Sequence, residues 1–207
     1  MITLHGIPLS NYYSIIKMAL LEKGMAFEEA LVRPNQEQPY LDKSPMGKVP
    51  CLETGQGFLT ETDVILDYLD ESGTGPHLFP QDPFARAKVR ELMKYCELYL
   101  ELPARRLYGE VFFNQPPLSD EQKKEIRQQL EKGFAALDRL AAYDPYLAGK
   151  QLSAADLYFL YTVGLVTRAV KKGLDWDVFS QAPKIRDLLT LLGQRESAQK
   201  IAADQAA

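Results

Sequence analysis

The spacing of hydrophobic residues changes near residue 80, and this change constrains the fold more than any other feature of the chain. Before it, short apolar runs of strand length alternate with helical patterns, whereas from Phe84 onward the spacing is helical throughout. The 207 residues suffice for one large domain or for two small ones with separate cores. We therefore predict an α/β domain over residues 1–75, a Pro-rich linker over 76–83 and an all-helical domain over 84–207.

The first part of the chain predicts the element order β-α-β-loop-β-β-α. Gly24 is a natural stop for the first helix, and the Gly-rich gap Thr54–Gly57 predicts a hairpin between the last two strands. The expected strands are Met1–Gly6, Phe27–Val32, Val49–Glu53 and Gly57–Thr60, and the expected helices are Tyr13–Lys23 and Glu61–Glu71.

The second part predicts helices over about 84–114, 119–142, 153–170 and 183–201. Pro103 lies inside the first of these and is expected to kink it, because proline lacks the N–H that a helix interior needs. The Ala-rich tail from Ile201 is expected to fray.

Composition argues against several classes of function. The formal net charge of −4 is unlike the basic face that a nucleic-acid-binding protein presents. No apolar run approaches the ~20 residues that span a membrane. The start of the sequence has no basic segment followed by an apolar one, so we expect no signal peptide and a cytoplasmic location.

The cysteines and histidines do not predict a metal site. Cys51 and Cys96 have no CxxC spacing, and the only histidines are His5 and His77, so a zinc site of the usual Cys/His kind cannot be assembled. We expect two buried thiols rather than a disulfide, and any thiol chemistry would then come from a bound molecule.

The segment Gly47–Pro50 places a proline at the head of an expected strand. Proline donates no hydrogen bond, so the strand cannot be fully paired there. If the Val49–Pro50 bond is cis, the N–H and C=O of Val49 become available to pair with an extended peptide. The alternative is an edge strand that merely begins with proline.

The segment Thr60–Asp63 opens a helix directly after a strand. Free N–H groups and the positive end of the helix dipole favour a carboxylate there. Thr62 offers a hydroxyl donor to that carboxylate, and Glu61 offers an acceptor to an ammonium, so the pair suits a group that carries both charges on one carbon. The alternative is that Thr60 and Asp63 simply cap the helix.

Together these motifs resemble the glutathione site of the cytosolic glutathione transferases. The matching segments are Ser44–Leu52 and Leu59–Leu69, and the resemblance extends into the helical half through Leu147–Asp156. In that last segment Ser153 and Asp156 form an S-x-x-D cap, which we assign to folding rather than catalysis.

The resemblance implies a thioredoxin-like N-terminal domain with a cis bond before Pro50. It implies that the Val49 main chain pairs with the cysteinyl part of glutathione and that Glu61 and Thr62 hold the γ-glutamyl end. Lys48 would lie near the glycyl carboxylate, the alternative being a solvated surface lysine.

The resemblance also points to the residue that activates the glutathione thiol. Ser10 falls where serine-type classes of the family keep their activating serine, although it is also a possible helix N-cap. Asn11 and Tyr12 are the fallback donors. Tyr12 stands where other classes keep a cysteine, which favours conjugation or peroxide reduction over disulfide exchange.

A second substrate is expected to be a small apolar electrophile. We assign its pocket to Tyr12, Arg106 and Tyr108. The family implies a homodimer, and the lack of a Cys/His cluster leads us to expect no metal. One alternative is a non-catalytic regulatory relative, like the stringent starvation proteins. Another is a glutathione-dependent isomerase, which the missing cysteine disfavours.

Overall fold

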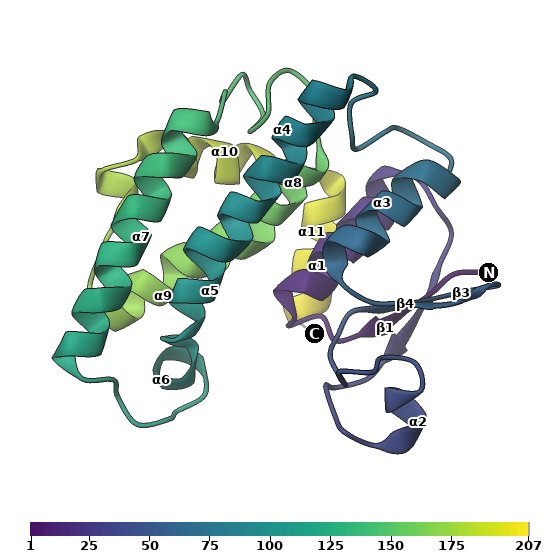
Figure 1. Ribbon diagram of the computed structural model, residues 1–207, viewed down its shortest axis with the longest axis horizontal. Coiled ribbons are helices and arrows are strands. Elements are labelled where there is room, and N and C mark those ends of the chain that lie inside the picture. The colour runs from purple at the N-terminus through teal and green to yellow at the C-terminus, as the bar shows by residue number, and fades with distance from the viewer. Residues whose placement is uncertain (207) are drawn as a thin grey trace. The chain divides into compact units, whose positions relative to one another are not determined.

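The structure, a computed structural model, describes residues 1–206 and divides into two units (Figure 1). The first unit contains Met1–Leu78 and the chain from Gln194 onward, and the second contains Phe79–Gly193. The predicted fold class, an α/β part followed by an all-helical part, is confirmed. No helix among the described residues is long and apolar enough to cross a membrane.

The first unit is built on a four-stranded mixed sheet in the order β2-β1-β3-β4. β1 and β2 run parallel, whereas β3 runs antiparallel to both β1 and β4. Leu4 pairs with Leu52 at the centre of the sheet, and both side chains are fully buried. The strands are β1 (Thr3–Gly6), β2 (Glu28–Leu31), β3 (Cys51–Thr54) and β4 (Gly57–Leu59).

Two longer helices of this unit, α1 and α3, lie side by side on one face of the sheet (Figure 1). The buried side of α1 includes Ile15, Ile16 and Leu20, which are fully buried. The loop predicted between β2 and β3 holds one short helix, α2. The helices within Met1–Leu78 are α1 (Asn11–Glu22), α2 (Gln38–Leu41) and α3 (Thr62–Ser72).

The second unit is helical. It contains two π-helical stretches: η1 lies between α4 and α5, and η2 lies between α8 and α9. In chain order its elements are α4 (Pro83–Lys94), η1 (Tyr95–Glu101), α5 (Leu102–Arg105), α6 (Tyr108–Phe112), α7 (Asp120–Leu140), α8 (Ala154–Tyr158), η2 (Phe159–Val163), α9 (Gly164–Leu174), the 3₁₀ turn η3 (Val178–Ser180) and α10 (Pro183–Gly193).

Pro103 is the second residue of α5 and lies just after the π-helical stretch η1, while the kink expected at this residue stays a prediction. Residue 103 has no N–H, so it cannot donate an α-helical hydrogen bond to the Tyr99 carbonyl. That carbonyl approaches Gly133 of α7, where an added Cβ would lie 2.3 Å from the Tyr99 oxygen. A side chain at residue 133 would therefore push the two helices apart.

Ser153 and Asp156 form the predicted capping box at the start of α8. Asp156 is fully buried and accepts hydrogen bonds from the Leu147 N–H at 2.7 Å, the Ser153 N–H at 2.8 Å and the Ser153 hydroxyl at 2.9 Å. Burial raises the pKa of Asp156, and these donors oppose that rise. The carboxylate ties the incoming loop to the helix, which supports a role in folding.

The C-terminal region differs from the prediction in two ways. The sequence predicts one helix over 183–201 and a frayed tail, but α10 ends at Gly193 and a separate helix, α11 (Glu196–Ala206), follows. Ile201, the start of the expected tail, is 1% exposed. A buried apolar contact fixes this segment, so it does not fray.

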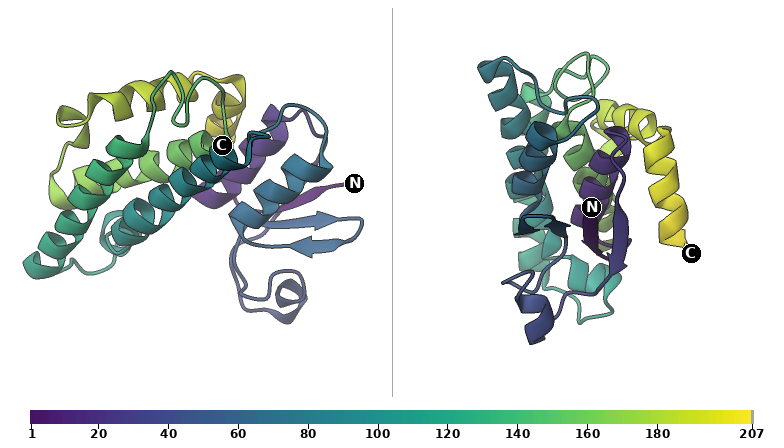
Figure 2. Two further views of the ribbon diagram at one scale, coloured as in Figure 1. Left: turned by 45° about the horizontal axis from the view of Figure 1, so that its top comes forward. Right: turned by 90° about the vertical axis from the view of Figure 1, so that its right-hand side faces the viewer.

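The same segment also changes the domain boundary. The sequence assigns 84–207 to the helical domain, yet α11 belongs to the first unit and lies along α1 (Figure 2). The physical reason is a set of polar contacts to α1. Arg195 donates two hydrogen bonds to the Glu22 carboxylate, at 2.7 and 2.6 Å, and the Ser197 hydroxyl donates a third.

Candidate active site

The loop before β3 is fixed by a glycine that no other residue can replace without strain. Gly47 has φ of +62°, and a Cβ at this position would lie 2.0 Å from the Asn35 carbonyl oxygen. The Asn35 N–H donates to the Gly47 carbonyl at 3.0 Å, and the Gln36 amide donates to the Met46 carbonyl at 3.2 Å. The preceding loop is thereby held against Met46–Gly47.

Two hydroxyl groups brace the next residue. Tyr40 and Ser44 each donate a hydrogen bond of 2.8 Å to the Lys48 carbonyl, while the Lys48 side chain is exposed. The Val49–Pro50 bond is cis, as expected from the resemblance. Among residues 1–206 no hydrogen bond of the Val49 main chain is found.

Cys51 follows Pro50 in the chain, and its thiol is unreactive near neutral pH. It is fully buried, its Sγ donates to the Lys43 carbonyl at 3.4 Å, and burial raises its pKa to about 11. A thiol with this pKa stays protonated near neutral pH. Cys51 and Cys96 are both free and buried, which confirms the prediction of two thiols without a disulfide.

The N-terminus of α3 has an unusual start. Glu61 is its N-cap residue, with φ of 66° and ψ of 121°, and it makes no side-chain capping hydrogen bond. Residues other than glycine rarely adopt a positive φ, and they keep it mainly at functional positions. Of the two caps considered from the sequence, Thr60 makes no capping hydrogen bond within residues 1–206, and Asp63 accepts from the neighbouring Val64 N–H at 3.1 Å.

Thr62 is the first residue of α3 and is 6% exposed. No hydrogen-bond partner of its hydroxyl is found in residues 1–206. A poorly capped helix start next to an unused hydroxyl is the arrangement that binds a carboxylate, because the first N–H groups and the helix dipole both favour negative charge.

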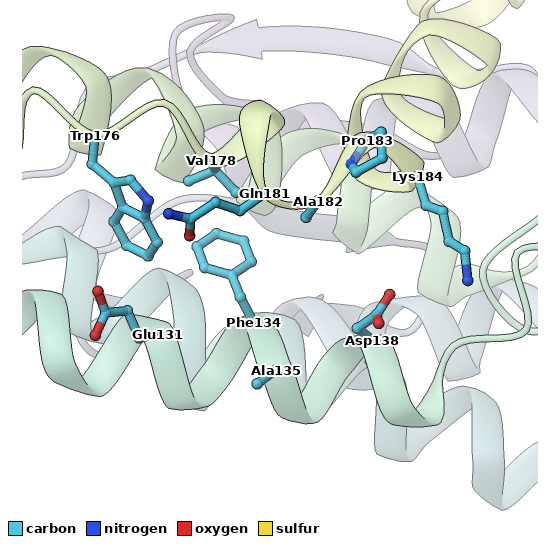
Figure 3. Close-up of a pocket in the computed structure, with 10 residues that line it drawn as sticks. All are labelled: Glu131, Phe134, Ala135, Asp138, Trp176, Val178, Gln181, Ala182, Pro183 and Lys184. Carbon is cyan, nitrogen blue, oxygen red and sulfur yellow. The ribbon is translucent and has the colours of Figure 1, made fainter.

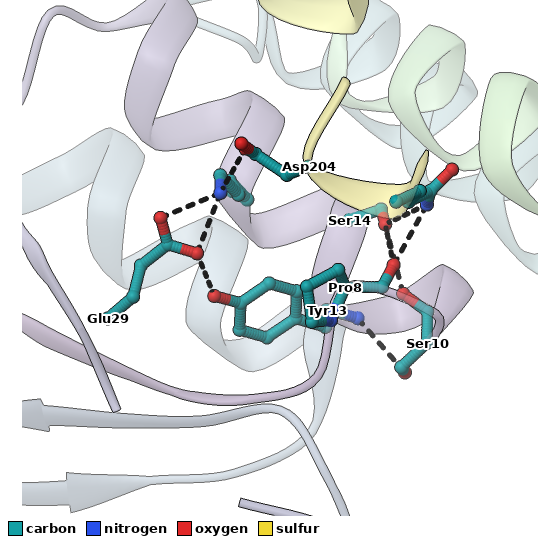
Figure 4. Close-up of polar contacts among 8 residues, drawn as sticks. Pro8, Ser10, Tyr13, Ser14, Glu29 and Asp204 are labelled. Carbon is teal, nitrogen blue, oxygen red and sulfur yellow. Dashed lines mark hydrogen bonds and ion pairs between the residues drawn. The ribbon is translucent and has the colours of Figure 1, made fainter. Parts of the chain in front are cut away.

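Ser10 is the N-cap residue of α1, which was one of its two roles considered from the sequence. Its hydroxyl oxygen accepts from the Tyr13 N–H at 3.3 Å (Figure 4). A serine hydroxyl has two acceptor lone pairs and one donor, and this cap uses one lone pair. The capping role therefore leaves the Ser10 proton available to donate to a ligand.

Asn11 and Tyr12, the fallback donors, lie in the first turn of α1, and both are half-buried. The helix thus begins at Asn11 rather than at Tyr13 as predicted, because the Ser10 cap allows the turn to start immediately after it.

The strand registers bring the predicted glutathione-site residues of the first unit to one end of the sheet. His5, near the end of β1, pairs with Cys51 at the start of β3, and Leu59 at the end of β4 pairs with Leu52. The segment after β1, the Val49–Pro50 bond before β3 and the start of α3 after β4 therefore leave the sheet at the same end.

The two remaining pocket residues, Arg106 and Tyr108, belong to the second unit. Arg106 forms an exposed ion pair with Glu125 at 2.9 Å. Tyr108 is buried, packs edge-on against Phe112 with ring centroids 5.4 Å apart, and has a pKa raised chiefly by burial.

The second unit also has a cavity of about 310 Å³ beside α7 (Figure 3). Phe134 and Trp176 form an aromatic wall with ring centroids 5.7 Å apart, and Asp138 and Lys184 add charged groups. Arg106 and Tyr108 do not line it, so it differs from the electrophile pocket predicted from the sequence. Within residues 1–206 no cluster of three or more His, Cys, Asp or Glu side chains is arranged to hold a metal ion.

Two features of the site escape sequence reasoning. The positive φ of Glu61 has no signal in the sequence, because glutamate is not a residue that favours it. The bracing of the Lys48 carbonyl by Tyr40 and Ser44 depends on tertiary contacts, although both hydroxyls lie in the polar loop next to the motif.

Comparisons with known proteins agree with this geometry. Residues 4–77 match the family model for the glutathione S-transferase N-terminal domain, and residues 120–190 match that for the C-terminal domain. A glutathione S-transferase of Pseudomonas putida is 47% identical, over 100% of this chain and 94% of its own. A stringent starvation protein A homolog of Pasteurella multocida is 27% identical, over 80% of this chain and 73% of its own.

A solved structure supports the fold. The glutathione S-transferase of Methylobacillus flagellatus, crystallised with glutathione bound, has a TM-score of 0.80 and 21% identity, covering 97% of this chain and 98% of its own. The first unit therefore has the thioredoxin-like fold, followed by the helical unit that is typical of these proteins.

Proposed function

The chain belongs to the glutathione S-transferase family and is a glutathione transferase, and we propose that the Ser10 hydroxyl holds the glutathione thiol as a thiolate for attack on an apolar electrophile. The role of Ser10 rests on the hydroxyl proton that its cap on the Tyr13 N–H leaves available, and the binding of glutathione rests on the start of α3. There the helix lacks a side-chain cap and the Thr62 hydroxyl lacks a partner among residues 1–206.

Glutathione fits the residues at this end of the sheet. The γ-glutamyl carboxylate would bind the first N–H groups of α3 and the Thr62 hydroxyl, and the γ-glutamyl ammonium would pair with Glu61. The cysteinyl part would pair with the Val49 main chain next to Pro50, in the manner of an added strand. The exposed Lys48 ammonium would bind the glycyl carboxylate.

Ser10 supplies the chemistry in this proposal. An ordinary cysteine thiol has a pKa of ~8.5, so little thiolate is present at pH 7. A hydroxyl that donates to the thiolate, but not to the thiol, lowers that pKa. Lowering it by about two units requires roughly 2.7 kcal/mol of differential stabilisation, which a hydrogen bond to a charged group supplies in large part.

The reaction that follows is attack of the thiolate sulfur on an electrophilic carbon, with departure of a leaving group or protonation of the adduct. Peroxide reduction is the related alternative for the same thiolate. Tyr12, Arg106 and Tyr108 remain the proposed contacts of the apolar substrate. The exposed Arg106–Glu125 pair leaves the guanidinium at the surface, where a substrate can reach it.

Several finer expectations stay proposals. A homodimer and a role in detoxification rest on the family. A cytoplasmic location, no metal requirement and no nucleic-acid or membrane partner rest on the sequence and its composition. The regulatory alternative, represented by stringent starvation protein A homologs, is not favoured, since the relative that matches the full chain at 47% identity is a glutathione S-transferase. A glutathione-dependent isomerase remains disfavoured because Tyr12 stands where a cysteine is needed.

The test combines binding with turnover. We expect the protein to be retained on immobilised glutathione, to elute with free glutathione, and to conjugate glutathione to an activated aryl halide. A matched test variant is Thr62→Val, which removes the hydroxyl at nearly constant shape and should weaken retention on immobilised glutathione. Retention without any conjugation or peroxidase activity would support a binding protein and contradict the proposed chemistry.

A further inference from the structure

The C-terminal helix reaches the loop that carries Ser10. The side-chain amide of Gln205, near the end of α11, donates to the Pro8 carbonyl at 2.8 Å and to the Ser14 hydroxyl at 3.1 Å. The two acceptor residues, Pro8 and Ser14, are labelled in Figure 4. These contacts join residues that are 197 and 191 positions apart in the sequence.

The orientation of the Gln205 amide follows from its partners. The Pro8 carbonyl only accepts hydrogen bonds, so the Gln205 atom facing it is the nitrogen. Nε2 has two protons, and the two contacts use both of them. The Ser14 hydroxyl, which accepts from Gln205, then donates its own proton onward.

The Ser14 hydroxyl proton is donated to a carbonyl of the loop Pro8–Ser10. Ser14 Oγ lies 3.0 Å from the Ser10 carbonyl and 3.3 Å from the Pro8 carbonyl, and Ser14 itself is fully buried. The shorter contact completes a directed chain from Gln205 through Ser14 to the Ser10 carbonyl. Hydrogen bonds in such a chain strengthen one another.

Ser10 is consequently held from several sides. Its N–H donates to the Ile7 carbonyl at 3.0 Å, its carbonyl accepts from the Ser14 N–H at 3.0 Å and from the Ser14 hydroxyl, and its own hydroxyl accepts from the Tyr13 N–H. The group left without a fixed partner in this set is the Ser10 proton. Its direction therefore depends on how firmly the loop is held.

We propose that Gln205 is a positioning residue for Ser10, so that the C-terminal helix takes part in thiol activation without touching glutathione. This inference rests on the proposed role of Ser10. The contact through Pro8 and Ser14 sets the geometry of the loop, and a donor displaced by less than an ångström loses much of its effect on a developing charge.

Two ion pairs hold the C-terminal segment to α1 independently of Gln205. Asp204 pairs with Lys17, and Arg195 pairs with Glu22, so the helix stays docked when Gln205 changes. Gln205 is exposed, so its loss leaves no cavity. A matched control lies on the same helix: Gln199 is also exposed, and its side-chain amide donates to the Gln194 carbonyl at 3.4 Å.

The experiment compares Gln205→Ala, Gln205→Glu and Gln199→Ala in the full chain. Turnover is measured with an activated aryl halide, and the pH midpoint of the bound thiol is measured by titrating the ultraviolet absorbance of the thiolate. We expect Gln205→Ala to raise that midpoint by about half a pH unit, which leaves about threefold less thiolate below the midpoint and lowers kcat accordingly. Gln205→Glu should do more, because a carboxylate oxygen would face the Pro8 carbonyl. Gln199→Ala should match the unmodified protein.

Ser10→Ala and Ser14→Ala separate the possible failures. If Ser10→Ala lowers turnover but Gln205→Ala behaves like Gln199→Ala, this inference is overturned and the role of Ser10 stands. If Ser10→Ala itself changes neither the thiol midpoint nor turnover, both fall. Combining Gln205→Ala with Ser14→Ala should have less than the summed effect if the two act in series, and full additivity would overturn the chain through Ser14.

Discussion

The Lys17 ammonium lies 2.7 Å from a carboxylate oxygen of Asp204, although 187 residues separate them in the sequence. Lys17 also lies 2.7 Å from both carboxylate oxygens of Glu29, and its side chain is only 3% exposed. A buried ammonium needs such partners, because removing a charge from water is costly. Burial alone would lower the pKa of Lys17, but the hydrogen bonds and charges of Asp204 and Glu29 raise it. This cluster fastens the C-terminal helix to α1.

Asp204→Ala should therefore destabilise the protein. Lys17 keeps Glu29 as a partner, so we expect a loss of about 1.5–3 kcal/mol in the free energy of unfolding, the usual worth of a hydrogen bond to a charged group. Urea unfolding followed by circular dichroism measures it. Lys200→Ala, an exposed change on the same helix, is the control, and equal stability of the two variants would show that the ion pair does not fasten the helix.

The Glu22 carboxylate should make stability depend on acid pH. Burial raises its pKa, but the hydrogen bonds from Arg195 and Ser197 more than offset this and lower it below the ordinary value of 4.5. A carboxyl whose folded-state pKa is lowered contributes stability that is present above its unfolded-state value and is lost as the pH falls through the folded-state value. Glu22→Gln should be less stable near neutral pH and should lose less stability than the unmodified protein below about pH 4.5. Parallel curves of unfolding free energy against pH would contradict this.

Ser10→Ala should lower kcat by about a hundredfold or more, as is usual when one donor to a developing anion is removed, and should leave the KM for glutathione nearly unchanged. It should also cost about 1 kcal/mol of stability, because the cap on the Tyr13 N–H is lost. Ser10→Thr keeps a hydroxyl and should retain activity. An unchanged kcat in the alanine variant would move the role to Asn11 or Tyr12.

Glu61 allows binding and stability to be separated. Its backbone has φ of 66°, which costs a residue other than glycine about 1–3 kcal/mol. Glu61→Gly removes this strain, but the glycine adds about 0.5–1 kcal/mol of backbone entropy to the unfolded chain. The free energy of unfolding should therefore stay constant or rise by up to about 2.5 kcal/mol. Glu61→Ala keeps the strain and should not gain stability. Calorimetry should show that both variants bind glutathione more weakly, and unweakened binding would remove Glu61 from the site.

Thr62→Val tests the hydroxyl at the start of α3. The shape is nearly conserved and the hydroxyl has no protein partner among residues 1–206, so the melting temperature should change little. Affinity for glutathione should fall by about tenfold, the worth of one hydrogen bond to a charged group. Thr62→Ser should bind nearly as well as the unmodified protein. If the Thr62→Val and Thr62→Ser variants bind glutathione equally well, the hydroxyl does not contact the ligand.

The segments that local chemistry dictates were predictable. The Gly47–Pro50 segment, the cis bond expected before Pro50 and the start of α3 next to Glu61 and Thr62 each depend on residues close in sequence, and the structure has them where expected. The capping box of Ser153 and Asp156 is of the same kind, because both partners lie within one helical turn.

The position of the C-terminal helix could not be predicted from the sequence. A helical pattern reveals that α11 has an apolar side, but not which surface covers it, and nothing local to Asp204 or Gln205 indicates Lys17, Ser14 or Pro8 as partners. The positive φ of Glu61 is hidden for a related reason, since the surrounding structure imposes it against the preference of the residue.

The sequence by itself determined the element order of the first 72 residues, the two-part architecture and the two segments that we propose to bind glutathione, because periodicity, caps and turns are set by residues a few positions apart. Only the tertiary structure decided that the last helix returns to the first unit and holds the Ser10 loop. That contact pairs a buried ammonium and a loop carbonyl with residues almost two hundred positions away, and such pairing is decided by the free energy of burying charges and polar groups together, which no local pattern records.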